Sequence, residues 1–158
     1  MKKGIVAALF AVGGAALGAV SVGKSMKERV DYKSKMSEKH LSLYLMMNQW
    51  VKIKQENKSI ADYLEQNGYK EIAIYGMNYV GETLLDELAN SNIKVKYAID
   101  KNADAIYSDI DVVTPDDELT EVDAVIVTAI TFFDEIEEHL LDKMDCPILS
   151  MEDILYEV

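Results

Sequence analysis

Residues 72–85, IAIYGMNYVGETLL, have the spacing of a phosphate-binding turn. Gly76 and Gly81 occupy the first and last glycine positions of a G-x-G-x-x-G pattern, and Asn78 replaces the middle glycine. At that middle position the backbone of a dinucleotide-binding domain approaches the pyrophosphate, which binds at the N-terminus of the following helix. The pattern therefore predicts the frame of such a turn. The Asn78 side chain is expected to project into the space of a pyrophosphate.

Other polar residues near this turn could hold a ligand. Asp100 closes the next apolar segment, about 20 residues after Gly81, where a carboxylate accepts a hydrogen bond from a ribose in dinucleotide sites. Tyr79 and Thr128 offer hydroxyl groups beside predicted strand ends. The candidate ligand is a nucleotide or a nucleotide-sugar, and its identity stays open. The candidate cofactor-binding residues are Gly76, Asn78, Tyr79, Gly81, Asp100 and Thr128.

The elements that must position these residues alternate between strand and helix. Apolar segments predict strands at 71–75, 95–100, 110–115, 123–130 and 146–150. Amphipathic segments predict helices at 78–91, 131–144 and 151–158. A short helix at 60–67 is expected to precede them, with Ser59 as its cap and Gly68 as its end. This alternation predicts an α/β fold with a small doubly wound parallel sheet of about five strands, which is Rossmann-like.

The first 58 residues have a different composition. Residues 24–56 lack Pro and Gly and predict a long helix, on which Leu43, Met47 and Trp50 form an apolar stripe. This stripe either packs on the adjoining domain or serves self-association. We therefore predict a membrane anchor at 1–23, a juxtamembrane helical segment at 24–58 and a Rossmann-like domain at 59–158.

The anchor prediction rests on residues 4–23, which carry no charge. Twenty helical residues span roughly 30 Å, enough for a bilayer core. The alternatives are a cleaved signal peptide, with Ala19-Val20-Ser21 as its small-residue site, and a buried helix. Several lysines and Arg29 follow the segment directly and favour a single-pass inner-membrane anchor with a cytoplasmic domain. Gly14 and Gly18 form a G-x-x-x-G pair that either mediates homo-oligomerisation or arises by chance.

Charge and rare residues exclude several functions. Residues 1–58 carry a net charge of +7 and residues 59–158 one of −19, which argues against a nucleic-acid partner for the folded part. One cysteine and two distant histidines give no zinc ligand set. We identify no catalytic residues and no metal ligands in the sequence, and we lean against an enzyme.

The segment YLEQNGYKEIAIYGMNYVGETLLDELANSNIKVKYAIDKNA resembles a small Rossmann-like domain of bacterial surface-glycan proteins. That domain is the N-terminal nucleotide-sugar-binding part of sugar O-acyltransferases and an accessory domain of glycosyltransferases. The resemblance covers about residues 48–158, without the hexapeptide-repeat or glycosyltransferase domain of those proteins. It implies little about activity, and our first hypothesis is a membrane-tethered, non-catalytic module that is accessory to cell-envelope polysaccharide biosynthesis. The alternative is a small NAD- or nucleotide-sugar-dependent enzyme subunit that needs a partner chain.

Overall fold

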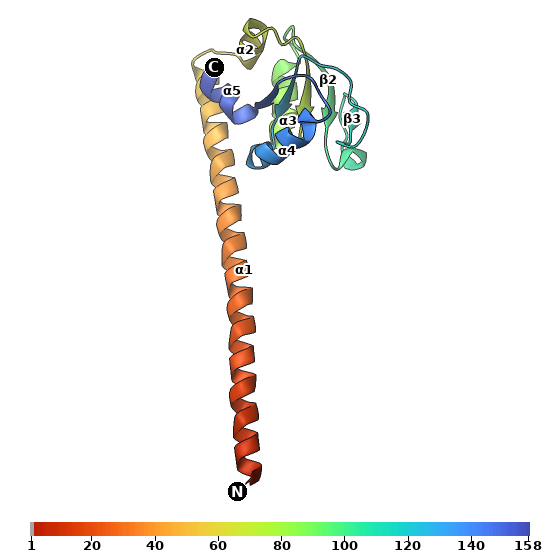
Figure 1. Ribbon diagram of the computed structural model, residues 1–158. Helices are drawn as coiled ribbons and strands as arrows, with labels where there is room; N and C mark the ends of the chain where they lie inside the picture. Colours follow the sequence, from red (N-terminus) through yellow and green to blue (C-terminus); the bar gives the residue numbers. More distant parts are fainter. Residues whose placement is uncertain (1) are drawn as a thin grey trace. The chain divides into compact units, whose positions relative to one another are not determined.

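The computed structural model describes the backbone of residues 2–158 and the side chains of Lys27 and residues 29–158 (Figure 1). The chain divides into two compact units, Met1–Leu43 and Tyr44–Val158. Helix α1 (Lys2–Gln55) contains the long helix predicted from residue 24. The predicted anchor at 1–23 and the pair Gly14 and Gly18 lie outside the residues whose side chains are described. Within the described residues, no helix is long and apolar enough to cross a membrane.

The second unit is built on a five-stranded sheet. Its order is β3-β2-β1-β4-β5, and all neighbouring strands are parallel. The chain therefore starts in the middle of the sheet, moves to one edge and returns to build the other half. This arrangement confirms the predicted α/β fold with a parallel sheet. The strands are β1 (Glu71–Tyr75), β2 (Lys94–Ile99), β3 (Val112–Val113), β4 (Ala124–Val127) and β5 (Ile148–Ser150).

Short helices precede the sheet, follow it and connect some of its strands. The predicted cap of the first one is confirmed, because the Ser59 hydroxyl accepts a hydrogen bond from the Asp62 N–H. Gly68 follows this helix in a left-handed conformation, with φ of +84°. The β2–β3 connection holds only a 3-10 turn, and the β3–β4 connection holds no helix. The helical elements are α2 (Ile60–Gln66), α3 (Tyr79–Leu88), η1 (Ala103–Ala105), η2 (Ile130–Phe132), α4 (Phe133–Leu141) and α5 (Met151–Glu157).

The sheet buries side chains on both faces. Alternate strand residues, Tyr75 and Ile99 among them, form one cluster with Ile136 and Leu140 of α4. The intervening strand residues point to the opposite face, where α3 packs, because crossovers that run toward opposite sheet edges place their helices on opposite faces. Among the helices of the described residues, α4 is the one that contributes to this cluster, and the connection from β3 to β4 holds no helix.

The last turns of α1 belong to the folded unit. Met46, Trp50 and Ile53 are buried, and the Trp50 indole N–H donates to the Glu87 carboxylate at 2.6 Å. The Gln49 amide donates to the Leu155 carbonyl of α5, which lies beside this part of α1 (Figure 1). Trp50 thus packs on the domain, the first of the two alternatives, whereas Met47 of the predicted stripe is 37% exposed. The compact unit begins at Tyr44, fifteen residues before the predicted boundary, because these contacts join the helix to the sheet domain.

Candidate functional site

The turn after β1 requires both of its glycines. Gly76 has φ of +98°, and an added Cβ would lie 2.8 Å from the Thr128 hydroxyl oxygen. At Gly81 an added Cβ would lie 2.2 Å from the Gly76 carbonyl oxygen. The first glycine therefore permits the left-handed turn, and the second permits the close approach of α3. This is the geometric frame expected from the glycine spacing.

The chain itself occupies backbone donors of this turn. The Met77 N–H donates to one Asp100 carboxylate oxygen at 2.9 Å, and the Asn102 N–H donates to the other at 2.9 Å. The Val80 N–H donates to the Asn78 side-chain oxygen at 2.9 Å, so Asn78 caps α3. The Asn78 oxygen is thus directed back at the helix N-terminus. The N–H groups of Met77 and Val80 lie in the segment that holds phosphate in dinucleotide sites.

The other two predicted residues differ in their surroundings. Thr128 is fully buried, and its hydroxyl lies 2.5 Å from the Gly76 carbonyl and 3.1 Å from that of Tyr75. It thereby links the end of β4 to the turn after β1. Tyr79 is 88% exposed and projects into solvent. The structure therefore gathers five of the six predicted residues around one turn and leaves Tyr79 outside.

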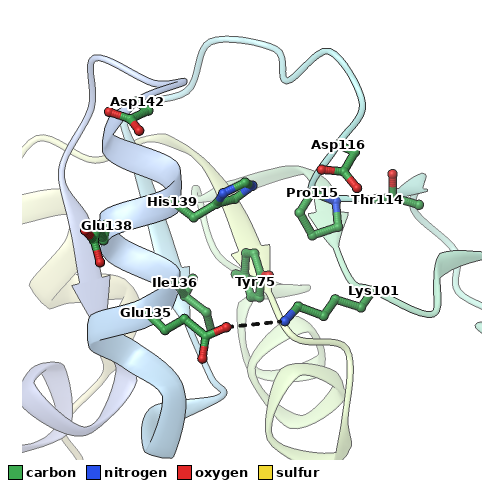
Figure 2. A pocket seen from close by; sticks show the side chains of 10 residues that line it. All are labelled: Tyr75, Lys101, Thr114, Pro115, Asp116, Glu135, Ile136, Glu138, His139 and Asp142. Atoms are coloured by element: carbon green, nitrogen blue, oxygen red, sulfur yellow. Dashed lines mark ion pairs between the residues drawn. The ribbon is translucent and has the colours of Figure 1, made fainter.

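A cleft of about 610 Å³ opens near this turn, on the sheet face that α4 only partly covers (Figure 2). Tyr75, the last residue of β1, lies at its centre (Figure 2). One wall is α4, and the opposite wall is the loop that follows β3. Its size is in the range of small-molecule pockets. The lining residues are Tyr75, Lys101, Thr114, Pro115, Asp116, Glu135, Ile136, Glu138, His139 and Asp142.

The cleft has a negative electrostatic character. Four of its lining residues are carboxylates, against one lysine. Burial raises the pKa of Tyr75, and the nearby carboxylates of Asp100, Glu135 and Asp116 raise it further. The phenol therefore stays neutral at physiological pH. The Lys101 ammonium lies 3.8 Å from a Glu135 carboxylate oxygen at the exposed rim.

The wall opposite α4 is fixed by hydrogen bonds. The Asp117 carboxylate accepts from the Thr114 N–H at 2.7 Å and from its hydroxyl at 2.8 Å. These bonds lower the pKa of Asp117. The Lys143 ammonium donates to the Pro115 carbonyl at 2.5 Å. The loop therefore holds Pro115 and Asp116 at the rim in a defined position.

None of the residues that line this cleft belongs to the six predicted from the sequence. Asp116 and Glu135 belong to acidic clusters that look like solvated surface in the sequence, since nothing there indicates that they face one another. Tyr75 carries a usable signal, because ligands of parallel α/β sheets bind beyond the carboxyl ends of the strands. Within the described residues, no three His, Cys, Asp or Glu side chains are grouped so as to hold a metal ion.

The strand order and the glycine turn at its centre define an α/β protein with a doubly wound parallel sheet. Residues 68–148 match the family described as C2185-like, N-terminal. The match spans half of the chain, and the protein belongs to this family. Comparison with curated proteins and with solved structures gave no match.

Proposed function

We propose that the protein is a membrane-tethered, non-catalytic Rossmann-like module that serves as an accessory subunit in bacterial cell-envelope glycan metabolism. The glycan assignment rests on the resemblance of residues 48–158 to domains of surface-glycan proteins. The tether rests on the uncharged run at 4–23 and on the basic residues that follow it.

The observation that argues against a nucleotide-dependent enzyme is the hydrogen bond from the Met77 N–H to Asp100. A ligand phosphate would have to displace this carboxylate, and the Asn78 cap on the Val80 N–H as well. Both bonds occupy backbone N–H groups that would otherwise donate hydrogen bonds to a phosphate. We therefore propose that nucleotides and nucleotide-sugars bind weakly at this turn.

Calorimetric titration of the full chain in detergent with NAD, UDP and a UDP-sugar tests this proposal. The wild type should show no binding at micromolar ligand, and Asn78→Gly should raise the affinity because it frees the Val80 N–H. Replacing an N-cap by Gly costs only a few tenths of a kcal/mol, so this variant should stay folded.

The contrary result is micromolar binding by the wild type that both Asn78→Gly and Asp100→Ala weaken. A lost hydrogen bond to a charged group is worth about 1.5–3 kcal/mol, or roughly a tenfold to hundredfold loss of affinity. That outcome would favour the alternative of a nucleotide-dependent enzyme subunit.

A further inference from the structure

The cleft beside β1 contains a polar group that the proposed function does not use. The Tyr75 side chain is only 5% exposed. Its ring packs in the core cluster under α4. Within the described residues its hydroxyl has no hydrogen-bond partner, although it lines an open cavity. No buried side-chain polar atom of the described residues lacks a partner, so the Tyr75 ring is buried while its hydroxyl oxygen is accessible from the cavity, where a ligand can reach it.

The charges around this hydroxyl select the ligand. Asp116 and Glu135 stand on opposite walls of the cleft, and Glu138 and Asp142 add charge along α4 (Figure 2). The ammonium of Lys143 lies 4.0 Å from Asp116, and Lys101 lies 3.8 Å from Glu135. The lining therefore keeps an excess of negative charge, which attracts cations and repels phosphates.

The geometry points to an organic cation. A metal ion needs several ligands around one centre, and no such group of side chains exists in the described part of the chain. The carboxylates instead line a cavity of about 610 Å³ together with the aromatic side chain of Tyr75. A space of this size suits a larger cation with a charged end and an apolar stem.

We propose that this cleft binds an alkylammonium or guanidinium group. The cation takes the position beside Glu135 that Lys101 holds, and its N–H donates to the Tyr75 hydroxyl oxygen. An incoming cation can readily replace Lys101 beside Glu135, because these two side chains are 70% and 74% exposed. This site is separate from the glycine turn and does not depend on the function proposed there.

The cation has two sources with the same chemistry, a free amine or a basic side chain of a protein. Calorimetric titration of the full chain at low salt uses cadaverine for the first and Nα-acetylarginine methylamide for the second. Saturable binding of either probe is the expected result, and the tighter one identifies the source. Glutarate, an anion of similar length, should not bind.

Four single variants locate the site. Tyr75→Phe keeps the ring and should weaken binding about fivefold, and Glu135→Gln about tenfold, because each removes a hydrogen-bond partner of the cation. Lys101→Gln removes the competing ammonium and should strengthen binding about threefold. Glu137→Gln changes the same charge on the same helix outside the cleft and should leave the affinity unchanged.

Three results would overturn the proposal. The first is absence of binding by both cations, and the second is equal binding of glutarate. The third is an unchanged affinity in Tyr75→Phe, which would reduce the binding to general attraction by an acidic surface. The melting temperature of each variant, measured in the same samples, confirms that the compared proteins are folded.

Discussion

Individual residues of the glycine turn have separate structural roles. Gly76 combines a left-handed backbone with a close neighbour, and Gly81 has only the close neighbour. Gly68 has a left-handed backbone with φ of +84° and open space around it. Substitutions at these three glycines therefore allow the cost of backbone strain and the cost of steric overlap to be measured separately in one protein.

Alanine substitution at these three glycines should give graded losses of stability. Gly68→Ala should cost about 1–2 kcal/mol, the ordinary cost of a left-handed alanine. Gly76→Ala should cost more, because its Cβ also meets Thr128. Gly81→Ala should be at least as severe, since its Cβ would overlap the Gly76 carbonyl, a backbone atom.

Urea denaturation of the three variants, followed by circular dichroism, measures these differences. A loss at Gly81 no larger than that at Gly68 would show that α3 can move away from the turn. The tight contact between helix and turn would then have no role in stability.

At the scale of elements, the end of α1 is held by one carboxylate. Glu87 of α3 accepts hydrogen bonds from the Trp50 indole at 2.6 Å and the Lys54 ammonium at 2.9 Å. The Ile60 N–H reaches the same carboxylate at 3.4 Å. The Glu87 side chain is only 10% exposed, so this group ties α1, α2 and α3 together in a partly dry environment.

We expect Trp50→Ala to lower the free energy of unfolding by about 3–5 kcal/mol, because it removes a large buried side chain. Trp50→Phe keeps most of the apolar volume and should cost less. Both variants lose the hydrogen bond to Glu87, so the difference between their free energies of unfolding measures the contribution of packing. In the wild type the buried indole should emit at short wavelength; a solvent-like emission maximum would contradict its burial.

Strands β1 and β4 are linked at their beginnings by Asp123. Its carboxylate accepts hydrogen bonds from the N–H groups of Lys70 and Glu71 at 2.8 and 2.7 Å. These bonds lower the pKa of Asp123 below its ordinary value of 3.8. The folded state thus binds the proton less tightly than the unfolded state. The stabilisation is complete above pH 3.8 and is lost as the pH falls through the lowered pKa.

Asp123→Asn should therefore flatten the acid side of the stability profile, measured as urea midpoints between about pH 7 and pH 3. The exposed Asp109, in the loop between β2 and β3, provides the control Asp109→Asn. An equal acid dependence in Asp123→Asn and the wild type would show that these backbone bonds do not contribute.

At the scale of the whole molecule, the two units should behave differently in a cell. The uncharged run at 4–23 predicts that the full chain sediments with bacterial inner membranes at its full length. A chain that begins at Tyr44, the first residue of the second compact unit, should remain in the soluble fraction.

Fractionation followed by intact-mass measurement checks this prediction. A shortened chain in the periplasm or medium would identify residues 1–21 as a cleaved signal peptide. A full-length chain in the soluble fraction would contradict both interpretations of the N-terminus.

The sequence alone determined the α/β class, the five strands and the glycine turn. Local signals carry these features, because strand periodicity, Ser59 as a cap and the spacing of Gly76 and Gly81 depend on near neighbours in the chain.

Only the tertiary structure decided which groups meet. The bond from the Met77 N–H to Asp100, the burial of Trp50 against Glu87 and the cleft between Asp116 and Glu135 join residues far apart in sequence. The β3–β4 connection lacks a helix, so one face of the sheet stays partly open and Tyr75 lies at a cavity. Side-chain pairing across strands and helices has no periodic signal in the sequence, because it depends on how the elements pack.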